Sequence, residues 1–384
     1  MENALLPQSA QDVVDAIADA LRAGEKLAIT GGASKAAIGA PVAARRLEMT
    51  GLRGVVDYDP AELVLTVRPG TPLAEIQTTV AQAGQMLAFE PFDHGPMFGQ
   101  PEGAATIGGV VAAGVSGSQR LSGGAVRDHL LGFRAVSGRG ELFTAGARVV
   151  KNVTGFDLPK LAAGSWGRLF AMTELTLKVL PRPRESVTRL LAGLDVERAV
   201  AAMSLAMGSQ ADVAAAAHFP AGLSGGTSAT ILRVQGFGPS VAARCRMLDG
   251  LLAAFGPVGT LSPDDADAMW TALRTLAPLG QRAPLWRINV PPTGAPQIIK
   301  ALPADARALL DWAGGLIWLA ADIDPETVRA AALAAGGHAM LLRGDDRLRA
   351  NVPAFHPQPH GVAALEARVR RAFDPAGLFE TGRF

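Results

Sequence analysis

The sequence has 384 residues, of which 49% are hydrophobic, and a formal net charge of +1. A chain of this length buries a large core and has room for two domains, while the balanced charge gives no reason to expect a nucleic-acid partner. A single cysteine, Cys245, excludes an internal disulfide framework and an iron–sulfur cluster bound by this chain alone. Because no apolar run reaches the roughly 18 residues of a membrane helix, we expect no transmembrane segment. We expect the chain to be cytoplasmic, at most peripheral to a membrane.

The first residues predict a helix followed by a buried strand. Ser9 and Asp12 form a capping-box pattern ahead of an apolar stripe that Gly24 can end. Residues 26–30, KLAIT, then predict a short buried strand, which runs into the glycine turn GGASK at residues 31–35. This turn is the first candidate binding site.

Extended and helical patterns continue to alternate beyond the turn. Residues 54–70 predict two extended runs around Asp59 and Pro60. A helix is predicted next, with Thr71 as its cap, Pro72 at its first position and Gly84 after its end.

The middle of the chain is dense in glycine. Residues 105–117 read ATIGGVVAAGVSG, with no charged side chain. Further on, Ser137–Gly140 predicts a hairpin turn and residues 172–180 alternate like a strand, until Pro181 and Pro183 break the pattern. We place a domain boundary there, because the glycine motifs cease and mixed helix and strand patterns of a smaller α+β domain follow.

Because glycine has no side chain, a ligand can contact the main chain directly at these positions. Phosphates and flat ring systems are the ligands that commonly make such contacts. A phosphate loop of the nucleotide-triphosphatase type is disfavoured, because Val115 stands where its lysine should be. A nicotinamide-binding fingerprint is disfavoured too, since neither glycine cluster has the spacing G-x-G-x-x-G. Tight turns and close packing are the structural alternative for each cluster taken alone.

The ordered set of these motifs resembles the FAD-binding domain of the vanillyl-alcohol-oxidase, or PCMH-type, class. The motifs are GGASK, YDPAELVLTVRPGTPLAE, GGVVAAGVSG, GGAVRDHLLGFRAVSGRGE, KNVTGFDLPKLAAGSWG and LTLKVLPRP. Within that class the chain is similar to the FAD-binding accessory subunits of bacterial glycolate oxidases, through AGQMLAFEP, LWRINVPP and FDPAGLFETGRF. The resemblance implies an α+β protein with a two-subdomain PCMH-type FAD-binding domain at residues 1–183. A smaller α+β cap domain with an antiparallel sheet would occupy residues 184–345, and residues 346–384 would return to the FAD domain.

The resemblance also implies which residues bind FAD. The turn would hold the pyrophosphate through its amides, the Ser34 hydroxyl and the Lys35 charge, and the second glycine stretch would lie against the ribityl chain and the isoalloxazine edge. Later residues would surround the adenine and ribose. The candidates are Gly31, Gly32, Ala33, Ser34 and Lys35; Thr106, Gly108, Gly109, Gly114, Ser116 and Gly117; Gly124, Arg127 and Asp128; and Gly164, Gly167 and Ala171.

Several single residues have plainer explanations. Arg127 and Asp128 form an intramolecular ion pair as readily as a ligand contact. For Lys151 and Asn152 in the family motif, exposure to solvent is the commoner outcome for the lysine. His94 is more often structural than catalytic in such a loop.

A second group of residues bears on the substrate and on the fit of the cofactor. Trp286 and Arg287 either face a substrate or pack on each other, and packing is the commoner case. Phe170 stands where the related sequences usually have glycine and would narrow the adenine pocket. Trp166 replaces a commonly acidic or smaller residue, and Glu380 with Thr381 replaces the usual Asn-Pro.

Two features that occur in related proteins are absent from this sequence. GGASK contains no histidine and Cys245 lies outside the resemblance, so we expect FAD to be bound non-covalently. The related catalytic subunits carry a metal-binding motif H-x-G-D-G-N, which this chain lacks, so no catalytic residue and no metal ligand is assigned. The resemblance implies that the chain supports oxidation of glycolate to glyoxylate together with a catalytic FAD-binding subunit, with passage of the electrons to an iron–sulfur subunit implied as well. The missing motif implies that the chain does not oxidise glycolate alone. A structural scaffold without redox work and an autonomous FAD-dependent dehydrogenase of another small hydroxy acid stay open as alternatives.

Overall fold

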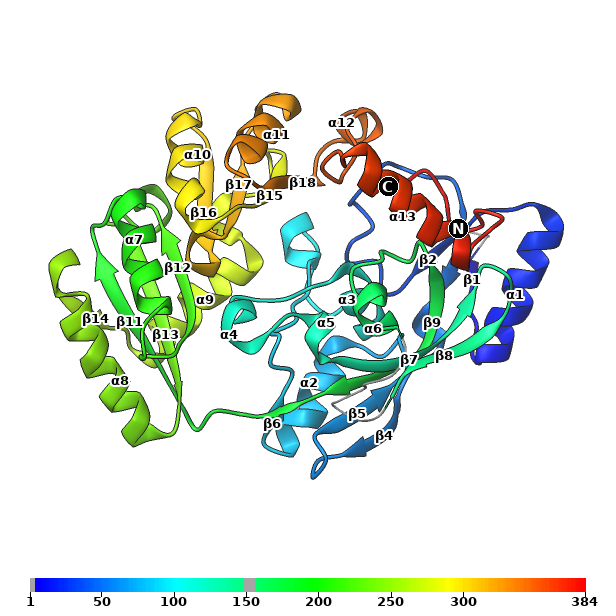
Figure 1. Ribbon diagram of the computed structural model, residues 1–384, viewed down its shortest axis with the longest axis horizontal. Coiled ribbons are helices and arrows are strands. Elements are labelled where there is room, and N and C mark those ends of the chain that lie inside the picture. The colour runs from blue at the N-terminus through cyan, green and yellow to red at the C-terminus, as the bar shows by residue number, and fades with distance from the viewer. Residues whose placement is uncertain (1–3, 148–155) are drawn as a thin grey trace.

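The computed structural model describes residues 4–147 and 156–384. Its two larger sheets lie in different parts of the molecule, one formed by the first half of the chain and one by the second (Figure 1). Helices cover both sheets, which confirms the predicted α+β class.

A small parallel sheet and one helix open the chain. The sheet has the order β1-β3-β2, and its strands are β1 (Ala4–Leu5), β2 (Leu27–Thr30) and β3 (Arg45–Glu48). Helix α1 (Ala10–Ala23) starts with the predicted capping box, in which Ser9 accepts from the Asp12 N–H, and Gly24 follows its end at φ 67°. The helix buries Val13 and Ile17, so its apolar stripe covers this sheet as the pattern predicts.

A five-stranded antiparallel sheet completes the first body, in the order β4-β5-β9-β7-β8. Its strands are β4 (Val55–Asp59), β5 (Val64–Val67), β7 (Leu130–Ser137), β8 (Leu142–Gly146) and β9 (Phe170–Lys178). The predicted hairpin turn joins β7 to β8, with Gly140 at φ 79°. The short strands β6 (Gln85–Met86) and β10 (Leu180–Pro181) pair separately.

The helices of this body are α2 (Leu73–Gln82), α3 (Ile107–Ala113), α4 (Arg120–Gly123), α5 (Val126–His129) and α6 (Leu158–Ala162). The predicted start of α2 is wrong by one residue, because Pro72 has extended ψ 137° and stands outside the helix. Thr71 does not cap it, since the Thr71 hydroxyl donates to the carbonyl of Arg68 at 2.7 Å instead.

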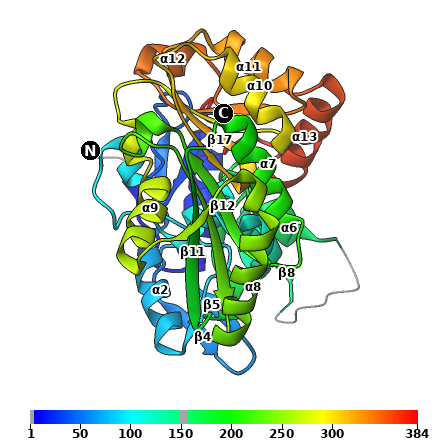
Figure 2. The ribbon, with the colours of Figure 1, turned by 90° about the vertical axis from the view of Figure 1, so that its left-hand side faces the viewer.

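The second body is built on an eight-stranded antiparallel sheet, in the order β14-β11-β13-β12-β16-β17-β15-β18. Its strands are β11 (Glu185–Ala192), β12 (Val213–Phe219), β13 (Ala229–Gly236), β14 (Val258–Thr260), β15 (Leu285–Asn289), β16 (Arg307–Asp311), β17 (Leu316–Ala320) and β18 (His338–Arg343). Helices α7 (Val196–Met207), α8 (Gly238–Leu251), α9 (Pro263–Thr275), α10 (Ala295–Ala301) and α11 (Pro325–Ala334) belong to it (Figure 2).

The two faces of this sheet have different neighbours because side chains alternate along each strand. One face, which includes Trp286, packs with α7, α8, α10 and α11 in a separate core. The other face, which includes Leu309 and Trp318, shares one continuous core with the first body. The two bodies are thus joined by apolar packing.

The last residues lie against the first body again. After α12 (Asp346–Asn351) and α13 (His360–Phe373), the chain ends beside the first body (Figure 1). The carbonyl of Leu378 accepts from the Leu27 N–H at 3.0 Å, and Phe379 is buried beside α1. The limits 183 and 345 are our proposed division of the chain into domains. Among the described residues, no helix combines the length and apolarity needed to cross a bilayer.

Candidate cofactor site

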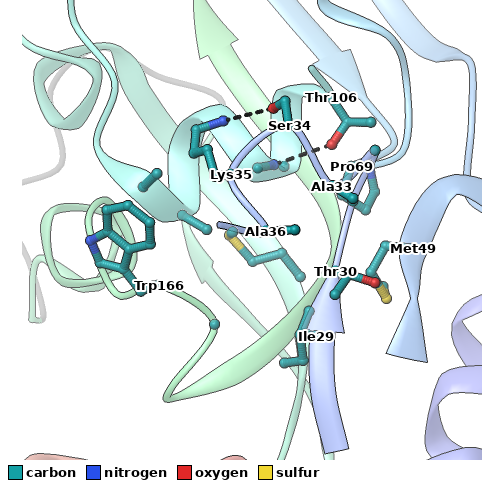
Figure 3. A pocket seen from close by; sticks show the side chains of 18 of the residues that line it. Ile29, Thr30, Ala33, Ser34, Lys35, Ala36, Met49, Pro69, Thr106 and Trp166 are labelled. Atoms are coloured by element: carbon teal, nitrogen blue, oxygen red, sulfur yellow. Dashed lines mark hydrogen bonds between the residues drawn. The ribbon is translucent and has the colours of Figure 1, made fainter. Parts of the chain in front are cut away.

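A cavity lies at the end of β2, between the turn at residues 31–36 and the start of α3 (Figure 3). Its volume is about 110 Å³. The lining residues come from β2, its turn, α3, the turn before β9 and the chain's last residues. They are Ile29, Thr30, Gly31, Gly32, Ala33, Ser34, Lys35, Ala36, Met49, Pro69, Thr106, Gly108, Gly109, Ala112, Ala113, Trp166, Gly167, Phe170, Met172, Arg383 and Phe384. We call this the first cavity.

The turn presents free hydrogen-bond donors to the first cavity. None of the backbone N–H groups from Gly31 to Lys35 donates to another residue that the structure describes. The Ser34 side chain is buried, and its Oγ lies 3.3 Å from the Lys35 ammonium. Successive N–H groups in such a turn favour anions, so this end of the cavity is suited to a phosphate.

Lys35 adds a buried positive charge to the turn, and little negative charge nearby offsets it. Burial lowers the pKa of its ammonium to about 8, and the charge of the Asp93 carboxylate opposes that effect. Asp93 is occupied elsewhere, because its oxygens accept from the N–H groups of Gly95 at 2.9 Å, Gly103 at 2.9 Å and Ala105 at 3.0 Å. A bound anion would restore the usual pKa of Lys35.

The glycines at the cavity are needed for two different reasons. A Cβ at Gly31 would overlap the Thr106 hydroxyl, and one at Gly32 would overlap the Ala104 carbonyl, so protein packing requires glycine there. A Cβ at Gly108 would stand 2.6 Å from the Pro69 Cβ. Gly109 differs, since the one atom within 4 Å of its Cβ would be Thr106 Oγ1, at 3.3 Å. Gly109 therefore opens toward the cavity, while its neighbours fit against protein.

The other predicted residues are spread over the molecule. Gly114, Arg127 and Gly164 line a second cavity of about 570 Å³ between the two bodies, and Ser116 and Gly117 line a third of about 390 Å³. Gly124 packs beside the Asp128 side chain, Asp128 pairs with Arg127 at 3.9 Å on the surface, and Ala171 is fully buried in the core beside α1. The structure does not bring these residues to the first cavity.

The second cavity is rich in positive charge. Arg120, Arg127 and Arg287 line it, and its lining contains no carboxylate. The guanidinium carbons of Arg120 and Arg287 lie 4.6 and 5.2 Å from the ring centroid of Trp312. Burial and the neighbouring Arg120 lower the pKa of Arg287 to about 10. Arg287 thus faces a cavity, whereas Trp286 is fully buried on the opposite face of the sheet.

The third cavity is mixed in charge and crosses the contact between the bodies. Arg233 pairs with Glu90 at 2.6 Å, and the Ser118 hydroxyl donates to Asp311 at 2.9 Å. Burial raises the pKa of the Asp311 carboxyl to about 7, against the hydrogen bonds from Trp312 and Ser118.

His94 is buried and its ring stacks on Phe92, with centroids 4.7 Å apart. Burial and the charges of Lys35 and Arg287 hold its pKa well below the usual range. This packing supports the structural interpretation of His94. Lys151 and Asn152 lie outside the described residues. Within 4–147 and 156–384, no group of three or more His, Cys, Asp or Glu side chains could hold a metal ion.

The sequence motifs did not predict several lining residues, among them Arg383 and Phe384, and they marked Trp166 only as a departure from the family pattern. Phe170 lines the first cavity as the pattern suggests, but its ring also stacks on Phe133 with centroids 5.0 Å apart. No local signal marks Arg383 or Phe384, because their place depends on the return of the last residues to the first body.

Comparisons with known proteins match both the beginning and the whole of the chain. A family model described as FAD binding domain matches residues 2–146. Glycolate oxidase subunit GlcE of Escherichia coli (strain K12) is 35% identical over 375 residues, which are 97% of this chain and 96% of that protein. D-lactate dehydrogenase of Anaerostipes hadrus is 30% identical over 155 residues, 40% of this chain and 31% of that protein.

A solved structure extends the likeness in fold. An alkyldihydroxyacetonephosphate synthase superposes with a TM-score of 0.70 and 15% identity, covering 98% of this chain and 75% of that one. The shared fold therefore includes both bodies.

Proposed function

Because the chain belongs to the family of glycolate oxidase subunit GlcE, whose members are FAD-dependent oxidoreductase subunits, we propose that it holds FAD non-covalently in the first cavity and serves a multi-subunit oxidase of glycolate or a similar 2-hydroxy acid. The observation that carries the proposal is the row of free amides from Gly31 to Lys35 beside an unpaired lysine. These groups fit the pyrophosphate of FAD, which carries two negative charges and several acceptor oxygens.

The residues of the first cavity would divide the work of binding. The five amides and the Ser34 hydroxyl would donate to the phosphates of bound FAD, and Lys35 would supply a positive charge. Gly109 leaves room along α3 for the cofactor, and Thr106 holds the first turn of that helix through the Gly109 N–H at 3.4 Å. When bound, FAD accepts an electron pair from a reduced substrate or partner and passes it on.

The second cavity of this chain is suited to a carboxylate ligand. Arg120 and Arg287 converge there from the two bodies with no carboxylate in the lining, and guanidinium groups bind carboxylates with two parallel hydrogen bonds. Oxidation of glycolate to glyoxylate removes two electrons and two protons. The chain lacks the H-x-G-D-G-N motif of the related catalytic subunits, so we assign the oxidation of glycolate to a catalytic flavoprotein partner. An iron–sulfur subunit would take the electrons.

The first experiment is the visible absorption spectrum of the chain purified alone, before and after acid precipitation. We expect flavin bands that move to the supernatant, and no bleaching when glycolate is added without air. Bleaching by glycolate alone would instead identify an autonomous dehydrogenase. A colourless chain that takes up no added FAD would identify a structural scaffold, and colour in the pellet would contradict non-covalent binding.

The role in a complex needs a second experiment. Co-expression with the catalytic and iron–sulfur subunits should give one co-purifying assembly that reduces an artificial acceptor with glycolate. Arg287→Met in this chain should leave its FAD content unchanged, because Arg287 does not line the first cavity. If the affinity of the purified chain for glycolate, measured by titration calorimetry, is also unchanged by Arg287→Met, the second cavity is not a carboxylate site.

A further inference from the structure

Helix α13 leaves part of its apolar stripe uncovered. Val362, Leu365, Val369 and Phe373 recur at steps of three and four residues, so their side chains line one side of the helix. In the C-terminal half this stripe is covered, because Val369 and Phe373 pack against the core of the first body. In the N-terminal half Val362 and Leu365 are 49% and 56% exposed. The sequence thus continues an apolar stripe beyond the part that the fold of this chain covers.

The uncovered half of α13 is held in place at the outer surface of the first body (Figure 1). The Pro359 carbonyl accepts from the N–H groups of Val362 and Ala363 at 2.9 and 3.0 Å, which closes the first turn. One turn further on, Glu366 pairs with Arg168 of the first body at 2.8 Å. A partner that binds here would meet a helix already formed, so little conformational entropy would be lost on association.

The space beside the uncovered stripe is open. A Cβ at Gly361 would meet no other part of the chain within 4 Å, and the small side chains of Ala363 and Ala364 are exposed. Small side chains let the axes of two packed helices come closer together. The N-terminal half of α13 therefore has the form of a helix-packing surface.

Two arginines border the stripe without a carboxylate beside them. Arg368 and Arg371 follow Leu365 at steps of three residues, so they lie on one side of the helix, and both are exposed. Within the described part of the chain neither forms an ion pair, whereas the neighbouring Arg370 pairs with Glu380 at 3.3 Å. A surface complementary to this one would be an apolar ridge bordered by carboxylates. We give the name α13 face to Val362, Leu365, Arg368 and Arg371.

We propose that the α13 face docks another subunit of the complex inferred above, and that this subunit contributes an apolar ridge bordered by Asp or Glu side chains. The inference rests on the proposed function, because it requires a multi-subunit assembly. Carboxylates of the partner pair with Arg368 and Arg371, while its apolar side chains cover Val362 and Leu365. No residue of α13 lines the second cavity, so docking at this face does not fill that cavity.

A second copy of this chain matches the α13 face less well. Two copies packed antiparallel about a two-fold axis bring the same flank of each helix together, so Arg368 and Arg371 would face their own copies. In a parallel pair these arginines would instead face the flank of Glu366 and Arg370, where the carboxylate is already paired with Arg168. Either arrangement leaves the two arginines without a free carboxylate.

An anionic membrane also matches the α13 face less well. Only Val362 and Leu365 would enter the lipid, and they offer less apolar surface than a single acyl chain, which alone binds membranes marginally. The Glu366 carboxylate follows Leu365 directly and would be repelled by anionic headgroups. A protein partner can place its carboxylates opposite the arginines and away from Glu366.

The test measures how tightly the purified full-length chain binds the purified catalytic and iron–sulfur subunits, by biolayer interferometry. Leu365→Asp should weaken binding at least about tenfold, because it places a charge inside the apolar contact. Arg368→Met should weaken binding several-fold, mainly through slower association, and should make it less sensitive to salt. Leu333→Asp is the matched control, because Leu333 is an exposed leucine on α11 of the second body.

Measurements on the isolated chain separate a lost contact from a lost fold. Because both side chains are exposed in the isolated chain, Leu365→Asp and Arg368→Met should leave its unfolding temperature and its flavin content unchanged. Should Leu365→Asp prevent folding, the measurement on Arg368→Met still decides, because that side chain pairs with no other residue of 4–147 and 156–384.

The outcomes separate this inference from the function on which it rests. Binding that neither Leu365→Asp nor Arg368→Met changes would overturn the proposal and leave the complex intact. A dimer of the isolated chain in sedimentation, or flotation with phosphatidylglycerol vesicles, would overturn it as well if Leu365→Asp abolishes either, because the face would then serve a second copy or lipid. A wild-type chain that binds neither subunit would refute the proposed complex itself.

Discussion

Replacement of Gly109 gives the sharpest test of where the cofactor lies, because the neighbouring Gly108 provides a matched control. A side chain at Gly109 meets only Thr106 Oγ1, at 3.3 Å, and otherwise points into the first cavity. Gly109→Ala should leave the empty protein as stable as the wild type or more stable, since alanine is favoured over glycine inside a helix by about 1 kcal/mol. Gly109→Val adds two methyl groups where the ligand would lie. Overpacking of this kind costs about 1–3 kcal/mol, so FAD should bind roughly five- to hundred-fold more weakly.

Gly108 should behave in the opposite way. A Cβ there stands 2.6 Å from the Pro69 Cβ and 2.9 Å from its carbonyl oxygen, so Gly108→Ala should lower the stability of the empty protein by about 1–3 kcal/mol. The assay is thermal unfolding of each apoprotein, followed by FAD titration and by the flavin content of the protein as purified. A folded Gly109→Val variant with unchanged flavin content would refute the placement of the cofactor against α3.

Three further predictions concern titratable and core residues. With the Lys35 pKa near 8 in the empty protein, binding of ADP should weaken above pH 8 by up to about tenfold per pH unit, and Lys35→Met should abolish that slope in calorimetric titrations. The Asp311 carboxyl, with its pKa raised to about 7, keeps its proton up to that pH in the folded protein and only to its ordinary value of 3.8 when unfolded. The free energy of unfolding should therefore fall as the pH rises from 4 to 7, and chemical denaturation of Asp311→Asn should show a smaller fall. Trp286→Ala removes a fully buried ring and should cost about 3–5 kcal/mol, while the affinity of the still folded protein for FAD should match that of the wild type.

Local signals predicted the elements whose cause is local. The Ser9 capping box, the αL glycine at Gly24 and the hairpin with Gly140 depend on residues within a few positions of one another, and the structure confirms all three. Pro72 shows the limit of such signals. Proline is compatible with both the first helical position and the residue before it, and the extended ψ of 137° selects the second.

The candidate site could be predicted only where a short sequence motif forms part of it. The resemblance placed GGASK beside the stretch that begins at Thr106, and the structure brings both to the first cavity. It does not bring Ser116, Gly117 or Ala171 there, because the chain turns toward the second body after Gly114 and because β9 points Ala171 into the core beside α1. Glycine alone does not distinguish contact with a ligand from contact with protein, as Gly109 and Gly108 show.

Burial of the Lys35 charge has a cost that a bound anion would remove, and this gives a criterion for a binding residue. Lys35 is held with a lowered pKa, while Asp93, whose charge opposes that effect, accepts from three amides. At pH 7 the charged Lys35 therefore opposes folding, so Lys35→Met should make the empty protein more stable. The same change removes a charge that FAD would pair with. FAD binding should therefore raise the free energy of unfolding less in the variant than in the wild type, for which a ligand at 100 times its Kd adds about 2.7 kcal/mol. A purely structural lysine would lower stability in both states when replaced. A rise in the stability of the protein without FAD, together with a smaller further rise on FAD binding, is thus the result that a binding role for Lys35 predicts.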